Sequence, residues 1–164
     1  MSADMHTIEK VLTLLAETPP RIVALTANLN TDQLHTPLHP DEWSARDVLA
    51  HLRSCGDVWS DCIVTILNED RPTIRAINPR TWITRTDYHQ QAFQRLLDAF
   101  LKRRTELLAI LEPLPPPDWF RSATVTGAGK TLERTVLFYA KWLAEHERSH
   151  IKQFKQIANG YTSE

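Results

Sequence analysis

The segment from Ser44 to Ile66 carries the strongest folding signal in the chain, because its apolar residues recur at alternating spacings of four and three. The stripe consists of Val48, Leu52, Cys55, Trp59, Cys62 and Ile66. Such spacing is the seam by which one helix packs against others in a bundle. Ser44 as N-cap, with Asp47 at the third helical position, resembles a capping box and marks where the helix begins. The segment therefore predicts one long helix with a buried face.

Three further segments show a helical apolar face, at residues 4–30, 87–111 and 131–158. Pro19 and Pro20 are expected to kink or split the first of these helices, with Thr18 capping its second piece. The connections at residues 68–86 and 112–130 are long and contain prolines, and we expect them to be loops. With only four glycines in 164 residues, the chain predicts an all-α four-helix bundle, folded as a single domain over residues 1–164.

Charge and hydropathy narrow the range of partners. The formal net charge is -1 and acidic and basic residues are interspersed, so no surface for nucleic acid or an anionic membrane is predicted. No apolar run approaches the roughly 18 residues of a membrane span, and residues 1–10 lack the apolar core of a signal peptide. Cys55 and Cys62 lie about 10 Å apart along one predicted helix, too far for a disulfide. We therefore expect a cytoplasmic protein.

Three histidines form the most informative pattern for function. His146 and His150 lie one turn apart on the inner face of the last predicted helix, and His51 lies on the flank of the stripe described above. Residues at this spacing differ by about 40° around the helix axis, so both rings can reach one ion. Three unpaired buried imidazoles would be costly, whereas neutral imidazole is a good ligand for zinc, nickel, iron and copper. The pattern predicts a metal site formed by all three.

The sequence His-Glu-x-x-His is also the signature of zinc proteases, in which the glutamate is the general base. Only fourteen residues follow His150, and Gln153 and Gln156 stand where the elongated form of that motif requires glycine and histidine. The context therefore argues against a protease. On the helix Glu147 points away from the midpoint of the two histidines, and we interpret it as a solvated carboxylate rather than a proton-transfer group.

Three other residues leave alternatives open. Cys55, four residues after His51, is interpreted as a small apolar residue of the seam, with a role as an extra metal ligand as the alternative. Arg104 lies in the apolar face of the third helix, where a guanidinium needs a partner. It either pairs with an internal carboxylate such as Asp57 or Asp61, or faces the cavity and holds an anionic substrate. Gln153, inward beside His150, is a candidate to bond a ligand or a metal-bound water.

Over nearly its whole length the chain resembles the DinB-like four-helix bundles, which include YfiT-type metal-dependent hydrolases and the bacillithiol and mycothiol S-transferases. The resemblance rests on Thr18-Pro19-Pro20, the run EWSARDVLAHL from Glu42 to Leu52, the run HERSHIKQ from His146 to Gln153, Arg104, and the pair Asp118-Trp119. The family often has aspartate where this chain has Glu147. The resemblance implies a divalent metal held by His51, His146 and His150, with open positions for water or substrate.

The resemblance also implies the chemistry. Zinc or nickel is the favoured ion, with iron or manganese as further possibilities, and a low-molecular-weight thiol can serve as cosubstrate. The expected function is a metal-dependent enzyme that acts on a small molecule by thiol S-transfer or by hydrolysis. The alternative is a non-catalytic bundle that binds a metal or a small ligand. Family-type bundles also make a homodimer possible, although the sequence carries no interface signature.

Overall fold

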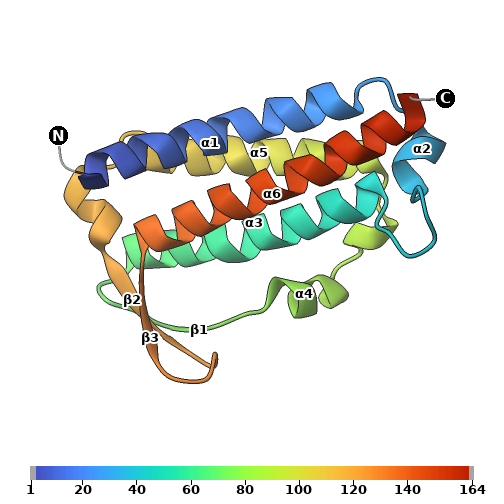
Figure 1. Ribbon diagram of the computed structural model, residues 1–164. Helices are drawn as coiled ribbons and strands as arrows, with labels where there is room; N and C mark the ends of the chain where they lie inside the picture. Colours follow the sequence, from blue (N-terminus) through green and yellow to red (C-terminus); the bar gives the residue numbers. More distant parts are fainter. Residues whose placement is uncertain (1–2, 163–164) are drawn as a thin grey trace.

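Four long helices lie side by side in the computed structural model, which describes residues 3–162 (Figure 1). They are α1 (Ala3–Thr26), α3 (Ala45–Asn68), α5 (Phe93–Leu111) and α6 (Val136–Thr162). Helix α3 packs on α5 and α6, and α1 packs on the same two helices. Helices α1 and α6 run in one direction, and α3 and α5 in the other. The predicted all-α four-helix bundle is confirmed.

Helix α3 begins where the sequence indicated. The Ser44 hydroxyl accepts a hydrogen bond from the Asp47 N–H at 3.1 Å, and the Ser44 N–H donates to the Asp47 carboxylate at 3.1 Å, which completes the capping box. The predicted stripe is buried except at Cys62, which is partly exposed. His51, on the flank of this stripe, is only 5 % exposed. The cap therefore sets the start of the helix that carries the first candidate ligand.

Helix α1 is continuous through its two prolines, so the expected split does not occur. The Thr18 hydroxyl donates to the Leu14 carbonyl at 2.9 Å and caps nothing. Pro19 has no N–H to donate to the Leu15 carbonyl four residues earlier. Arg104 donates to that carbonyl instead, at 2.9 Å. A side chain from α5 thus satisfies the backbone group that the proline leaves free.

A layer of polar side chains divides the apolar core into two clusters. Ile8, Leu15, Trp59, Leu107 and Leu143 belong to one cluster, and Ile22, Leu52, Phe100, Phe154 and Ile157 belong to the other. Between the clusters lie the buried residues Thr18, His51, Arg104 and Glu147, one from each long helix. Buried polar groups need partners, so the middle of the bundle is where interactions other than packing are made.

The connections between helices contain structure that the sequence did not predict. Strands β1 (Thr73–Arg75), β2 (Ser122–Thr126) and β3 (Leu132–Thr135) form a small sheet in the order β1-β2-β3. Strand β1 pairs with β2 in parallel, and β2 pairs with β3 in antiparallel fashion. Gly127 and Gly129, at φ angles of 85° and 89°, form the turn between β2 and β3. The predicted loops are therefore partly ordered as a sheet.

Short helices complete the fold. They are α2 (Thr31–His35), α4 (Pro79–Trp82) and the 3-10 helices Ile83–Arg85, Tyr88–Gln90 and Pro116–Phe120. Helix α5 begins at Phe93 and α6 at Val136, later than the predicted starts at residues 87 and 131. Residues 132–135 pair with β2 instead of entering the last helix. None of the helices within residues 3–162 has both the length and the apolarity that crossing a membrane requires.

Candidate metal centre

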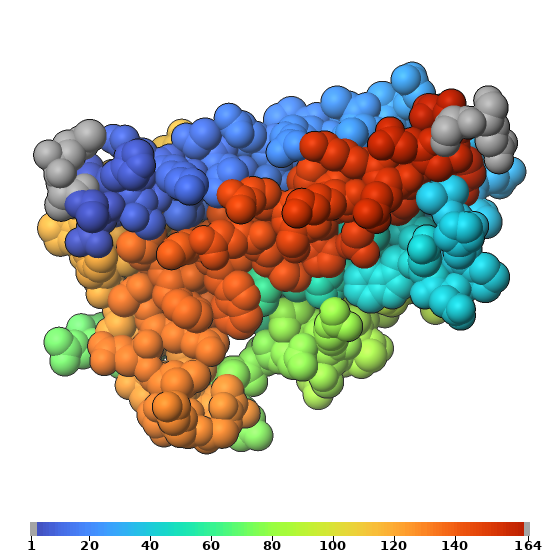
Figure 2. Space-filling model, in the orientation of Figure 1, coloured from blue at the N-terminus to red at the C-terminus, as the bar shows by residue number. Residues whose placement is uncertain are grey.

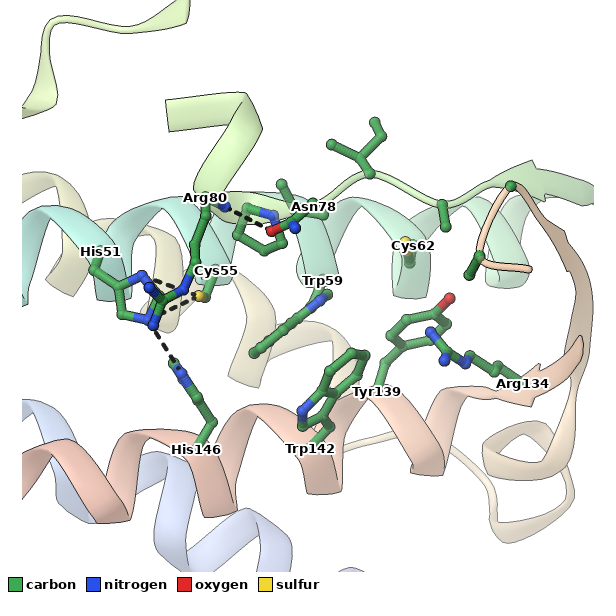
Figure 3. A pocket seen from close by; sticks show the side chains of 16 residues that line it. His51, Cys55, Trp59, Cys62, Asn78, Arg80, Arg134, Tyr139, Trp142 and His146 are labelled. Atoms are coloured by element: carbon green, nitrogen blue, oxygen red, sulfur yellow. Dashed lines mark hydrogen bonds between the residues drawn. The ribbon is translucent and has the colours of Figure 1, made fainter. Parts of the chain in front are cut away.

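The Nε2 atoms of three histidines converge between helices α3 and α6. His146 Nε2 lies 3.2 Å from His51 Nε2 and 3.2 Å from His150 Nε2. The His51 and His150 rings are 5.0 Å apart at their centroids. Figure 3 shows the rings of His51 and His146 pointing toward each other across the space between their helices. The structure thus brings together the three residues that the sequence singled out.

The arrangement of these nitrogens fits a metal ion better than it fits a hydrogen-bond network. Each Nε2 carries one proton or one lone pair, so His146 Nε2 can satisfy only one of its two neighbours by a hydrogen bond. Two nitrogens at zinc-ligand distance in tetrahedral geometry lie about 3.3 Å apart. The observed separations of 3.2 Å match that spacing. A cation bound at His146 Nε2 can also be reached by its neighbours, which a single hydrogen bond from that nitrogen cannot satisfy together.

The surroundings favour the neutral, ligating form of the rings. Burial, and the repulsion between the clustered histidines, lower the pKa of both His51 and His146 to about 4. The Nδ1 of His150 is hydrogen bonded to the Gln153 side-chain oxygen. When Nδ1–H donates in this bond, the lone pair of Nε2 is free for the ion. Gln153 therefore orients His150, whereas the sequence suggested that it would bond a ligand or a metal-bound water.

Cys55 offers a further ligand atom. Its sulfur lies 3.7 Å from His51 Nε2, and the ligand atoms of His51, Cys55 and His146 all lie within 4.8 Å of one another. Burial raises the pKa of the Cys55 thiol to about 12, so the thiol is neutral at pH 7 and must lose its proton to bind a metal. The structure is therefore compatible with both interpretations of Cys55, as a small apolar residue of the seam and as an extra metal ligand.

Glu147 is fully buried, so its interpretation as a solvated carboxylate is wrong. It forms a buried ion pair with Arg104, and its Oε1 atom has no hydrogen-bond partner among the described residues. The expectation that Arg104 meets an internal carboxylate holds, but neither suggested partner is the one used. Asp57 accepts a hydrogen bond from the Tyr88 hydroxyl, and Asp61 pairs with Arg103. Helix α6 is rotated so that Glu147 faces α5 while His146 and His150 face α3.

A cavity of about 490 Å³ opens beside the histidines. In Figure 2 the surface is hollowed between the β2–β3 hairpin, in orange, and the segment that carries α4, in green. The lining comprises His51, Cys55, Val58, Trp59 and Cys62 of α3, residues 76–80, Gly127, Ala128, Arg134, and Tyr139, Trp142 and His146 of α6. A second hollow of about 370 Å³ lies against His150 and Gln153. The candidate centre is therefore reachable by small molecules.

The sequence did not point to the residues that the connections contribute. Arg80, on α4, lines both hollows, and its guanidinium lies 5.7 Å from the centre of the Trp43 ring. Trp43 in turn packs edge-on against His51 at a centroid distance of 5.3 Å. Arg134, on β3, also lines the larger cavity. Trp43 and Arg80 lie outside the periodic helical segments, and Arg134 was expected at the start of the last helix, so the apolar periodicity placed none of them at the cavity.

The chain is similar to known proteins over most of its length. The family model described as "DinB superfamily" matches residues 14–154. A Bacillus licheniformis protein named "Putative metal-dependent hydrolase" is 26% identical over 161 residues, which are 95% of this chain and 89% of that protein. A Geobacillus thermodenitrificans protein of the same name is 23% identical over 154 residues, 91% of this chain and 84% of that protein.

A solved structure has the same fold. It is that of YfiT from Bacillus subtilis, described as "a probable metal-dependent hydrolase with an unusual four-helix bundle topology". The match has a TM-score of 0.78 and 19% sequence identity, and it covers 97% of this chain and 89% of YfiT. At this identity the likeness concerns the arrangement of the helices.

Proposed function

This chain belongs to the DinB superfamily, and we propose that it is a metal-dependent hydrolase of a small molecule. In this proposal one divalent ion is bound by His51, His146 and His150. The observation that carries the proposal is that His51 Nε2 and His150 Nε2 each lie 3.2 Å from His146 Nε2, at the edge of a 490 Å³ cavity. The names of the two bacterial relatives support the same class of activity.

The donor set determines what such an ion contributes. An ion held by three neutral ligands keeps its full charge, so it can polarise a carbonyl group and lower the pKa of a bound water toward 7. Imidazole ligands suit zinc, nickel and iron. We favour zinc or nickel, with iron or manganese as alternatives. His150 is held in the ligating orientation by Gln153. Trp59, packed edge-on to His146 at 5.3 Å, keeps one side of the site apolar.

The remaining charged groups near the site have separate roles. Glu147 does not line the cavity and is paired with Arg104, so it is not placed to take a proton from a substrate or water. Arg80 does line the cavity, and its positive charge contributes to lowering the pKa of His51 and His146. A guanidinium at this position can stabilise negative charge that develops on a reacting group.

Transfer of a low-molecular-weight thiol to a small electrophile is a second candidate function. The second hollow, on the His150 side, favours it because a transfer reaction needs room for two reactants. In such a transfer the thiolate sulfur bonds to an electrophilic carbon, and the leaving group departs with the electron pair of the broken bond. A bound divalent ion would favour the thiolate form of the thiol.

A panel of substrates separates these functions. Metal-loaded protein is assayed on aryl esters and amides without a thiol, and on an aryl halide with glutathione. Hydrolysis of an ester or amide supports the first proposal, and turnover only with thiol supports the second. Each activity should be lost in His51→Ala, His146→Ala and His150→Ala, with the helical circular dichroism signal retained. His39→Ala, at an exposed histidine, is the matched control. Ligand binding without turnover would indicate a non-catalytic binding protein.

A further inference from the structure

The cavity beside the histidines carries charge of one sign. Its lining contains two arginines, Arg80 and Arg134, and no aspartate or glutamate. Within residues 3–162, neither guanidinium forms an ion pair with a carboxylate. The whole chain has a formal net charge of -1, so the positive charge is a local property of this cavity. A cleft with charge of one sign raises the local concentration of oppositely charged ligands.

Arg134 lies at the end of the cavity away from the histidines. Figure 3 shows its guanidinium beside the Tyr139 ring, at the opposite end of the row of labelled side chains from His51. The residue is half-buried on β3, where pairing with Ala123 of β2 holds its backbone. The reacting group proposed above would lie at the histidine end, so Arg134 is free to bind a different part of the same molecule.

The neighbours of Arg134 hold its guanidinium without neutralising it. The guanidinium carbon lies 4.8 Å from the centre of the Phe138 ring and 5.2 Å from that of Trp142. The Tyr139 hydroxyl interacts with the same side chain. Stacking on aromatic faces leaves the N–H edges of a guanidinium available, and these edges match the two oxygens of a carboxylate.

An apolar wall connects the two ends of the cavity. Trp59 and Trp142 stack with ring centroids 4.3 Å apart and an angle of 24° between their planes. Trp59 also contacts His146, and Trp142 lies under Arg134, so the pair spans from the histidines to the arginine. Ile77, 54 % exposed, lines the same cavity from the β1–α4 connection. A ligand that fills this space needs an apolar middle portion.

We propose that the substrate is a small amphiphilic carboxylate whose acid group is bound by Arg134 and whose apolar middle lies on Trp59 and Trp142. Its reacting group lies at the histidines, and this part of the inference rests on the proposed function. Arg134 thereby selects anionic substrates over neutral ones of the same shape. The binding of the acid group depends on Arg134 and does not require the metal.

A matched pair of non-reacting probes tests the inference. Binding of 4-phenylbutyrate and its neutral amide, 4-phenylbutanamide, is measured by calorimetry on the full-length metal-loaded protein and on Arg134→Gln, Arg134→Lys and Arg95→Gln. Arg95 is an exposed arginine on α5 that does not line the cavity, so its variant controls for the lost charge. Urea unfolding of each variant verifies that it is folded.

The expected result is that wild type and Arg95→Gln bind the acid about tenfold or more tightly than the amide, as a charge-assisted hydrogen-bonded pair provides. Arg134→Gln should bind both probes about equally, and Arg134→Lys should keep part of the preference. Equal binding of the two probes by wild type, or a preference that survives in Arg134→Gln, would overturn the inference.

The same titrations on His146→Ala, with metal content measured on every sample, separate this inference from the proposed function. An acid preference that persists in His146→Ala and disappears in Arg134→Gln supports the role of Arg134, whether or not the wild type holds a metal. A preference that disappears in His146→Ala and persists in Arg134→Gln assigns the acid group to the metal and refutes the role of Arg134.

Discussion

At the scale of single residues, the polar layer in the middle of the bundle connects the candidate ligands to the fold. Glu147 follows His146 directly on α6 and is held by Arg104, which also bonds the Leu15 carbonyl that Pro19 leaves free. The ion pair therefore fixes the rotation of α6 that turns His146 and His150 toward α3. These contacts join residues of three helices, namely Pro19, Arg104 and Glu147. They therefore depend on how the helices pack.

The sequence indicated which histidines face the inside of the bundle, but it did not indicate the partner of Glu147. The reason is physical. The spacing of His146 and His150 is a property of one helix, and their convergence needs only an inward face. The environment of Glu147 depends on how α6 is rotated against α5, which sequence periodicity determines only coarsely. Because a buried guanidinium is unfavourable alone, the sequence indicates that Arg104 needs a partner. Only the packing of α6 on α5 identifies that partner as Glu147 instead of Asp57 or Asp61.

Breaking the buried ion pair should destabilise the protein strongly. Arg104→Met leaves the Glu147 carboxylate buried without its partner, and we expect a loss of about 3–5 kcal/mol in the free energy of unfolding. The double variant Arg104→Met with Glu147→Leu should recover most of this loss, because it removes both charges. Urea unfolding of the wild type and the two variants measures the effect. A loss of less than about 1 kcal/mol in the single variant would show that the pair does not hold α6 in place.

Replacement of Cys55 distinguishes the two possible ligand sets. If His51, His146 and His150 bind the ion, the Cys55→Ser variant should retain one cobalt(II) per chain. The cobalt-substituted wild type should then show no thiolate charge-transfer band. Absorption spectra of the cobalt-substituted wild type, Cys55→Ser and His150→Ala make the comparison. A thiolate band that vanishes in Cys55→Ser, with cobalt retained in His150→Ala, would assign the site to His51, Cys55 and His146.

At the scale of elements, the long helices were predictable and the strands were not. The apolar stripe and capping box at Ser44 are local signals that span many residues, and the end of α5 at Leu111 was predicted for the same reason. Strand β1 has three residues, and it pairs with β2 in the register Thr73 to Thr124. Pairing between segments this far apart leaves no local pattern in so short a strand.

The cap of α3 should contribute measurably to stability. Ser44→Ala removes the hydroxyl that accepts from Asp47, and we expect a loss of about 1 kcal/mol in the free energy of unfolding. Thr105→Ala, at an exposed position inside α5, serves as control and should change stability by less than about 0.5 kcal/mol. Both values come from urea titrations followed by circular dichroism. Equal effects of the two substitutions would mean that the cap adds nothing to the start of α3.

At the scale of the whole molecule, the cavity is produced by the connections. Because α3 and α5 run in the same direction, the chain between them must return along the bundle. Residues 76–80 of this connection line the cavity together with His51 and His146. The β2–β3 hairpin closes the other side. The sequence indicated long connections but not their path, so it did not place Arg80 at the cavity. It assigned residues 132–135 to the last helix instead of to β3, so it did not place Arg134 there either.

The stability of the metal-free protein should fall as the pH is lowered from about 6.5 toward about 4. His51 and His146 have a pKa of about 4 in the folded protein, against an ordinary value of 6.5. Between these values the unfolded chain binds more protons than the folded chain, so stability rises with pH there and is unaffected by these groups above about 6.5.

Urea unfolding at pH 7 and pH 5 tests this dependence, with the double variant His51→Gln, His146→Gln as comparator. The carboxyl groups of Asp57 and Glu147, whose pKa values are raised chiefly by burial, are present in both proteins and cancel in the comparison. The wild type should lose more stability than the double variant between the two pH values. Equal losses would show that the histidines are not buried in the neutral form.

The metal content of protein purified without an affinity tag tests the central claim most directly. Elemental analysis of the wild type should find about one equivalent of zinc, nickel, iron or manganese per chain, as expected for a single three-histidine site. His146→Ala should have lost the metal while remaining folded, and His39→Ala should have kept it. A wild type that binds no metal even after reconstitution, or a His146→Ala variant that binds as much as the wild type, would contradict the account.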